Sequence, residues 1–286
     1  MNQSEGRVPS VTGAAADALR DIDGGALPRD GWARRNQARI TGTTAVLVFL
    51  AIWQIVAAIR LVPALFLPGP TDIVEAAIEM SKHPLLLKDL QVSGTEFAVG
   101  YILAAVTAIP LGLATGWYPG VRHATDPFIN FLYATPRVVL LPLFIIWFGI
   151  GVESKIALCY LGAFFSIVIA TSQGVRTLDS HLIKVARSFG SSDLHMFRTI
   201  ALPGSVPFIL TGLRLGIGHA LIAVVVGELV AAQAGVGLRI AIAGATFQTA
   251  KVFAGVTLVA TTGLLATAVL ARLESNFDKW RVRDRE

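Results

Sequence analysis

Long stretches with almost no charged side chain restrict the fold of this chain more than any other feature of its sequence. Several of them run for roughly 17 to 22 residues, the length that an α-helix needs to cross the hydrocarbon core of a bilayer. Only 15% of the residues are charged, whereas an ordinary soluble protein has about 25%. The apolar runs show no alternation with a period of two residues, so the expected spans are helices and not barrel strands.

The sequence therefore predicts an all-α polytopic membrane protein with about six transmembrane helices. The expected spans are roughly Ile40–Ile59, Phe97–Trp117, Phe128–Phe148, Ile156–Ser172, Val206–Val230 and Val252–Ala271. This division leaves a largely disordered N-terminal tail (1–39), a transmembrane domain (40–275) and a short C-terminal tail (276–286). The N-terminal tail lacks the short apolar core of a removable signal peptide.

Basic residues indicate the orientation. They concentrate before the first span, between spans four and five, and after the last span. The positive-inside rule then places both termini in the cytoplasm. These residues flank apolar segments instead of forming a stripe with interleaved aromatic residues. The net charge of +5 is therefore explained by basic residues that lie beside the membrane spans, next to lipid. No nucleic-acid partner is expected.

Two loops on the outer side are predicted to have structure of their own. Ile73–Ser81 shows helical spacing of apolar residues, so this segment is expected to lie on the membrane surface or to pack on the spans. The loop around 235–238 is too apolar to extend freely into water and is expected to dip back toward a pore mouth.

The prolines expected to kink spans two and three are Pro110, Pro136 and Pro142. The glycines expected to allow close helix packing or bending are Gly112, Gly116, Gly216 and Gly218.

Several kinds of chemistry have no support in the sequence. The chain contains no Gly-x-x-x-x-Gly-Lys-Ser/Thr stretch, so it does not bind ATP through a P-loop. It has no His-Glu-x-x-His or Gly-x-Ser-x-Gly motif, and its five histidines are scattered. The single cysteine, Cys159, excludes an intramolecular disulfide and a thiolate metal cluster.

The interval Asp179–Pro203, between spans four and five, is predicted to fold as two short helices. Asp179 is a good N-cap and Gly190 a good C′ residue for the first helix. The residues that give this helix one apolar face, at i, i+3, i+4 and i+7, are Leu182, Val185, Ala186 and Phe189. Ser191 or Ser192 can cap the second helix, which is expected to end before the proline that closes the interval. This spacing fits a connector on the lipid surface and a docking element for a partner equally well.

The same interval carries a resemblance. Gly190, followed after nine residues by Ile200-Ala201-Leu202-Pro203, is similar to the cytoplasmic loop signature of binding-protein-dependent ABC transporter permeases. That signature reads Glu-Ala-Ala, three residues, Gly, nine residues, Ile, one residue, Leu-Pro. Lys184, Val185 and Ala186 stand where the family has Glu-Ala-Ala, so the first part of the signature departs and its charge is reversed.

The resemblance extends over roughly 65–281 and is closest to the sulfonate, taurine and nitrate branch of the family. The strings that carry it are Leu140-Leu141-Pro142-Leu143, Trp147-Phe148-Gly149-Ile150-Gly151, Gly212-Leu213-Arg214-Leu215, Gly227-Glu228-Leu229, Phe247-Gln248-Thr249 and Val252-Phe253-Ala254-Gly255. Each string is short, but their order and spacing together are specific.

The resemblance implies a permease with the type I ABC importer fold, acting as a homodimer in the bacterial cytoplasmic (inner) membrane. Two ATP-binding cassette subunits would bind the 179–203 loops and hold ATP and Mg²⁺, and an extracytoplasmic solute-binding protein would deliver a small anion such as a sulfonate, taurine or nitrate. The chain itself is implied to be no enzyme and to hold no cofactor. The coupling residues implied by the family motif are Lys184, Val185, Ala186, Ser188, Phe189, Gly190, Ile200, Leu202 and Pro203.

Four polar residues within the spans are candidates for a substrate pathway. Arg137 would lie ~14 Å deep in a straight span three, where a cation needs a cavity or a partner, so it would attract an anion or hold a neighbouring helix. Arg214 is within snorkelling range of the inner surface, which favours a structural or inner-gate role. His219 near mid-depth and Glu228 near the outer end would either line the pathway or make contacts between helices.

The alternative function is an ion-coupled secondary transporter or a channel without an ATPase. Such a protein would need membrane-buried carboxylates, and the expected spans contain essentially none apart from Glu228 near an edge. A membrane-embedded enzyme or assembly factor would need a catalytic constellation, which the sequence does not offer.

Overall fold

The computed structural model describes residues 32–275, and all regular structure within this range is helical. By its contacts the chain divides into two units, Met1–Ile55 and Val56–Glu286. Five of the described helices are long and apolar enough to cross a membrane, or six if one bent pair counts as a single span. The expectation of an all-α membrane protein with about six spans is therefore confirmed.

The first described helix is α2 (Trp32–Ala58), whose apolar part begins at Ile40 as expected. The helix itself starts earlier, inside the interval that was expected to be a disordered tail. The rest of that tail, residues 1–31, and the expected C-terminal tail, 276–286, lie outside the described residues.

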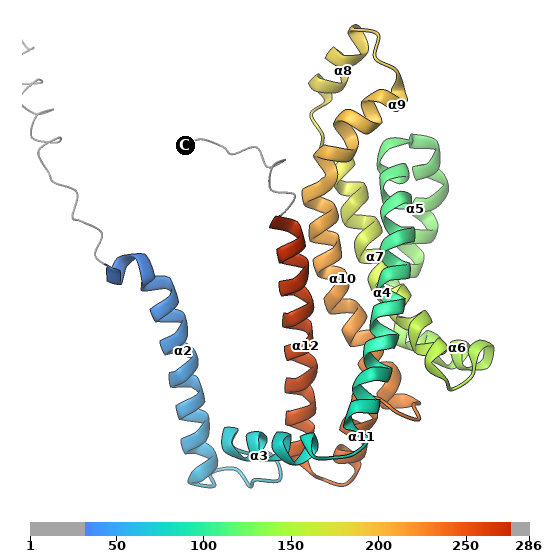
Figure 1. Cartoon of the computed structure of the whole chain (residues 1–286). Helices are drawn as coiled ribbons and strands as arrows, with labels where there is room; N and C mark the ends of the chain where they lie inside the picture. Colours follow the sequence, from blue (N-terminus) through green and yellow to red (C-terminus); the bar gives the residue numbers. More distant parts are fainter. Residues whose placement is uncertain (1–31, 276–286) are drawn as a thin grey trace, which may run out of the picture. The chain divides into compact units, whose positions relative to one another are not determined.

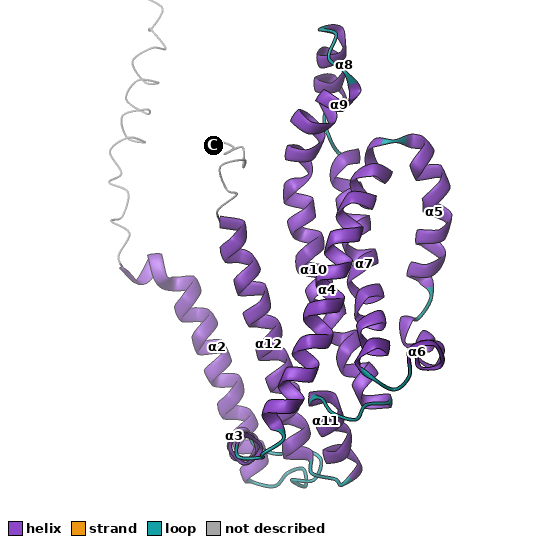
Figure 2. Cartoon of the chain, turned by 45° about the vertical axis from the view of Figure 1, so that its right-hand side comes forward, coloured by secondary structure: helices purple, strands orange, loops and turns teal. Residues whose placement is uncertain are grey.

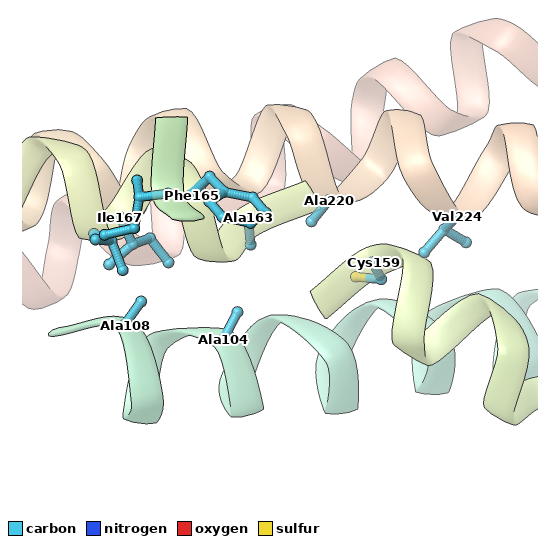
Figure 3. Packing of buried hydrophobic residues seen from close by; sticks show 10 residues of the cluster. Ala104, Ala108, Cys159, Ala163, Phe165, Ile167, Ala220 and Val224 are labelled. Atoms are coloured by element: carbon cyan, nitrogen blue, oxygen red, sulfur yellow. The ribbon is translucent and has the colours of Figure 1, made fainter. Parts of the chain in front are cut away.

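Three long helices form the core of the second unit: α4 (Leu86–Trp117), α7 (Val152–Arg176) and α10 (Leu202–Val230). α7 packs against α4 on one side and against α10 on another, as Figure 2 shows. Figure 3 shows the small side chains of Ala104 and Ala108 facing the larger core residues of α7. All three helices begin before the spans expected from hydropathy. In α4 and α7 the added first turns bury polar residues, among them Asp89, Glu96 and Lys155.

Small residues on α4 allow the close approach to α7. They recur at every fourth position, which places them on one face of the helix: Gly100, Ala104, Ala108, Gly112 and Gly116. A Cβ atom on Gly112 would lie 2.7 Å from Cβ of Thr171, and one on Gly116 would lie 2.6 Å from Cβ of Val175. The expected close packing is also present at Gly216, which lies against Ile167. The packing expectation is wrong for Gly218, because no atom lies within 4 Å of the position its Cβ would take.

Gly112→Ala is expected to destabilise the protein by about 1–3 kcal/mol through overpacking. One of the atoms that the new methyl group would meet is the carbonyl oxygen of Val168, at 2.8 Å, and a backbone atom cannot rotate away. Gly218→Ala is the matched control, and it is expected to be neutral or slightly stabilising because alanine favours a helix. Thermal unfolding of the purified protein in detergent measures both variants, and equal stabilities would contradict the packing argument.

The third expected span is not one helix. α5 (Pro119–Ala134) is followed by a short 3₁₀ helix, η1 (Arg137–Leu140), and by α6 (Leu141–Phe148), with a bend of 92° between the two halves. Pro136 causes the break, since a residue before proline avoids the helical region, and Thr135 is extended. The continuous span expected over 128–148 is therefore wrong, and the expected kink at this proline is a complete interruption.

Three helices gather at one end of the second unit: α3 (Pro70–Ser81), α11 (Val236–Ala245) and the start of α12 (Thr249–Ser275). α3 packs on α12, which confirms one of the two expected positions for this segment. The apolar loop around residue 235 leads directly into α11, which packs on α12, α10 and α4. The opposite end carries α8 (Ser180–Ser188) and α9 (Asp193–Met196), as Figure 1 shows.

Candidate functional site

The predicted caps of the loop between α7 and α10 are present. The backbone N–H of His181 donates to Oδ1 of Asp179 at 2.7 Å, so Asp179 caps α8. Gly190 follows the helix with φ +75°, a backbone conformation that favours glycine. The N–H of His195 donates to Oγ of Ser192 at 3.3 Å, which selects Ser192 over Ser191 as the cap of α9.

The second helix of this loop does not end before Pro203. A π-helical turn, η2 (Phe197–Ala201), joins α9 to α10 without interruption. Pro203 lies in the first turn of α10, where the missing N–H of proline costs little. The expected stop is therefore wrong, and one continuous helical segment runs from Asp193 to Val230.

The apolar face of α8 is exposed. Leu182 and Val185 are each more than half exposed, and Phe189 is 87% exposed. Lys184, Ser188 and Gly190 are exposed on the same short helix or just after it, and Ala186 is half-buried. We call the apolar surface formed by these three exposed side chains, Leu182, Val185 and Phe189, the α8 face.

The base of the loop is anchored in the core, in contrast to the α8 face. Met196 and Ala201 are buried, and Ala201 packs with Leu113 and Val175. Nε1 of Trp117 at the end of α4 donates to Oδ2 of Asp193 at 3.1 Å, and its ring contacts Phe197. The remaining predicted coupling residues lie at this base: Ile200, Leu202 and Pro203. The base of the loop is therefore joined to α4 by side-chain contacts and continues into α10.

Arg137 connects the bent third span to α7. It lies in η1, directly after the break, so a depth measured along a straight helix does not apply to it. Nη1 donates to the carbonyl oxygen of Gly162 at 3.2 Å, and the guanidinium lies over the rings of Tyr133 and Phe165, 5.4 and 5.8 Å from their centroids. This geometry matches the helix-holding alternative, in which a carbonyl and aromatic rings satisfy the cation.

Two further candidates also have protein partners. Nη2 of Arg214 forms an ion pair with Oε2 of Glu274 on α12 at 2.8 Å, and its side chain is half exposed. Nδ1 of His219 lies 2.9 Å from Oγ of Ser166, a contact that joins α10 to α7. In this structure both residues connect helices.

Glu228 is fully buried and holds the N-terminal end of α11. Its Oε2 accepts the backbone N–H of Gly237 at 2.6 Å, and its Oε1 accepts the hydroxyl of Ser93 at 2.5 Å. The N–H of Val236 in turn donates to Oγ of Ser93 at 2.9 Å. The capped-carboxylate alternative therefore describes Glu228 in this structure, although its cap comes from α4 and α11 and not from a membrane boundary.

Asp89 completes this polar network, and it was not among the candidates. It accepts the N–H of Gly235 at 2.9 Å and forms an ion pair with Nε of Arg239 at 2.5 Å. Asp89, Ser93 and Glu96 are spaced i, i+4 and i+7, so they share one face of α4. The acidic residues of 86–96 lower the hydropathy of this segment, so the expected span begins only at Phe97, whereas α4 begins at Leu86.

Lys155 and Glu96 are also buried, each about 1% exposed. Nζ of Lys155 donates to the carbonyl oxygens of Ile150 and Gly151 at 2.5 and 3.1 Å. One carboxyl oxygen of Glu96 has no hydrogen-bond partner among the described residues. The spans therefore do contain buried carboxylates, and the sequence argument that excluded an ion-coupled transporter is wrong on this point.

Comparisons with known proteins decide the family. The chain matches the family described as binding-protein-dependent transport system inner membrane component over residues 108–279. It is 34% identical over 279 residues to the putative aliphatic sulfonates transport permease protein of Bacillus subtilis (strain 168), covering 98% of this chain and 97% of that protein. It is also 34% identical over 255 residues to the taurine transport system permease protein of Escherichia coli (strain K12), covering 87% of this chain and 92% of that protein.

The fold has a counterpart among solved structures. A chain of the MetNI methionine ABC transporter, in an inward-facing conformation, matches with a TM-score of 0.59 and 18% identity, covering 68% of this chain and 96% of that chain. At this identity the match supports the fold alone, and it confirms the expected ABC importer permease architecture. The sequence relatives confirm the resemblance to the sulfonate and taurine branch. The chain belongs to the binding-protein-dependent transport system inner membrane components and is the permease component of an ABC importer.

Proposed function

We propose that this permease imports a small sulfonate through a bacterial cytoplasmic membrane, by alternating access that a separate ATPase drives. The observation that carries the proposal is the α8 face, with Phe189 87% exposed. In Figure 1, α8 projects past the turn between α4 and α5, which marks the end of the spans. An apolar face held beyond the spans suits a protein partner better than the lipid surface.

The ATPase would transmit its movement through the anchored base of the loop. Two ATPase subunits, holding ATP and Mg²⁺, would bind the α8 faces of two permease copies that share a pore at their two-fold interface. Closure of the ATPase pair would draw the loops together, and the contacts of Trp117 with Asp193 and Phe197 would pass this movement from α9 and η2 to α4. A solute-binding protein would deliver the solute at the end where α3 and α11 lie.

The solute class is proposed from the relatives. Two proteins that resemble the chain over most of its length are named for aliphatic sulfonates and for taurine. Both termini would be cytoplasmic, since this orientation places the basic loop between α7 and α10 on the side of the ATPase. Nitrate, which the sequence resemblance also implied, is included in the test.

Uptake by the reconstituted importer tests this function. We expect proteoliposomes containing the permease, its ATPase and its solute-binding protein to accumulate radiolabelled taurine or another sulfonate only when ATP is supplied. Nitrate is the comparison anion, and liposomes without the ATPase are the control. Uptake that follows an ion gradient in the absence of the ATPase would contradict the proposal.

A further inference from the structure

Five charged residues come together where α4, α7, α10 and α11 meet. They are Asp89 and Glu96 on α4, Lys155 on α7, Glu228 on α10 and Arg239 on α11. All except Arg239 are at most 2% exposed. A charge buried in a transmembrane bundle needs a partner, because neither lipid nor the protein interior solvates it as water does. The way in which each charge is compensated therefore decides which carboxyl groups are ionised.

Glu96 lies opposite Lys155 on the neighbouring helix. A Cβ atom on Gly100 would lie 2.7 Å from Cβ of Cys159, and the two α4–α7 contacts described above have the same offset in sequence number. α4 and α7 therefore run side by side in a constant register, which pairs the positions one turn earlier, Glu96 and Lys155. A Cβ atom on Gly227 would lie 3.1 Å from Cγ of Lys155, so the lysine side chain is located between α4 and α10.

Four of the five charges balance one another. Asp89 forms an ion pair with Arg239. Glu228 accepts a hydrogen bond on each of its two oxygens, as an ionised carboxylate does. Lys155, beside the turn of α10 that carries Glu228, supplies the second positive charge, since its hydrogen bonds go to backbone carbonyls that have no net charge. These four residues together carry no net charge.

Glu96 is the fifth residue, and no positive charge remains for it. Its Oε2 is buried without a hydrogen-bond partner among the described residues. Within residues 32–275 its carboxyl group also forms no ion pair. An ionised Glu96 would therefore leave the buried cluster with a net charge of about −1, which is costly away from water. A carboxyl group that keeps its proton is neutral, and the cost of its unpartnered oxygen is much smaller.

The other titratable groups nearby do not supply the missing positive charge. Glu153, two residues before Lys155 in the first turn of α7, is acidic and exposed to water. Cys159 keeps its hydrogen, because Sγ donates to a backbone carbonyl oxygen of α4 at 3.7 Å. Lys251 at the start of α12 is paired with Glu79 at 2.7 Å. A proton on Glu96 is therefore the simplest way to neutralise the cluster.

We propose that Glu96 is a proton-binding site, whose carboxyl group is protonated at neutral pH and releases its proton to water only under alkaline conditions. Glu96 follows Ser93 by about one turn on the same face of α4, and Ser93 donates to Glu228. Loss of the proton leaves two carboxylates close together, and their repulsion weakens the hydrogen bonds that hold the first turn of α11. The attachment of α11 thus depends on pH, whatever solute the importer carries.

Infrared spectroscopy of the purified permease in a detergent without ester groups tests the site. A protonated carboxyl group has a carbonyl band that is separate from the bands of carboxylates. We expect this band in the wild type at neutral pH, its loss at alkaline pH, and its absence in Glu96→Gln. Glu153→Gln, which removes an exposed carboxylate, is the control and should retain the band. A wild type without the band at neutral pH would overturn the inference.

Thermal unfolding at neutral pH decides which carboxyl group carries the proton. Glu96→Gln resembles the protonated acid in shape and charge, so its unfolding temperature should equal that of the wild type. Glu228→Gln should unfold at a lower temperature, because one amide oxygen cannot accept both hydrogen bonds. The reverse order would place the proton on Glu228. A large destabilisation by Glu96→Gln would mean that Glu96 is ionised and compensates Lys155. Either result would overturn the inference.

The dependence of stability on pH has a definite sign. An unfolded glutamate ionises at about pH 4.3. Above this pH the folded protein holds one proton more than the unfolded chain, so the equilibrium constant for unfolding rises by up to about tenfold per pH unit until Glu96 itself ionises. The unfolding temperature of Glu96→Gln should therefore fall less as the pH rises.

Hydrogen exchange measures the effect on α11. At the same alkaline pH, residues 236–245 should exchange faster in the wild type than in Glu96→Gln, in which this position cannot become charged. The control Glu153→Gln should exchange like the wild type. Parallel stability profiles of the wild type and Glu96→Gln, or equal exchange of α11 in the two proteins at alkaline pH, would contradict the proposed link between this proton and α11.

Discussion

Replacing Phe189 by alanine is expected to weaken binding of the ATPase by at least about thirtyfold, which corresponds to a loss of about 2 kcal/mol. Phe189 is the most exposed large apolar residue described in the second unit, and it lies at the C-terminal end of the α8 face. A single aromatic residue that fills a pocket of the partner typically contributes much of the binding energy of an interface. Coupled uptake should fall with the loss of binding, while the fold should be unaffected because Phe189 packs on no core residue.

Co-purification and a titration of the ATPase against immobilised permease measure this effect. Phe66→Ala is the matched control: Phe66 is 69% exposed but belongs to the segment that leads into α3, at the end opposite to α8. This control should retain full ATPase binding. Comparable losses in the two variants would point to general destabilisation, and an unchanged affinity of Phe189→Ala would place the docking surface elsewhere.

Replacing Glu228 by alanine is expected to lower the free energy of unfolding by at least about 1–3 kcal/mol, the range for leaving a buried hydrogen-bonding group without its partner. The side chain is fully buried, and its loss leaves the N–H of Gly237 and the hydroxyl of Ser93 without an acceptor. α11 should open before the rest of the molecule, because its first turn loses this attachment.

Thermal unfolding and hydrogen exchange of residues 236–245 measure the global and the local effect. Glu79→Ala is the comparison, because Glu79 pairs with Lys251 at 2.7 Å but is largely exposed, and an exposed pair contributes about 1 kcal/mol or less. A Glu228→Ala variant as stable as Glu79→Ala would mean that the network at α11 contributes little to stability.

Local signals in the sequence predicted much of this molecule correctly. Hydropathy located the spans, and the residue types of Asp179 and Gly190 predicted the boundaries of α8. These features depend on neighbours in the chain, so a single sequence contains them. The bend after α5 was underestimated, because the position of Pro136 predicts a break but not the direction in which the chain continues.

The polar network at α11 shows why the rest was missed. Asp89 and Glu96 reduce the hydropathy of their segment, and hydropathy alone cannot tell an exposed loop from a helix whose acids are buried against other helices. Their partners are distant in sequence, as with Asp89 and the N–H of Gly235. The four candidate pathway residues likewise have partners that are distant in sequence, which the sequence alone does not identify.

The π-helical turn η2 has a consequence for the direction in which the α8 face points. A π turn contains one more residue than the α-helical turn it replaces, and each residue of an α-helix rotates the chain by about 100°. Removing one residue from 197–201 would therefore turn α9 about the axis of α10 by that angle and separate Asp193 from Trp117. The number of residues between Gly190 and Leu202-Pro203 therefore sets the direction in which α8 and α9 project from the end of α10.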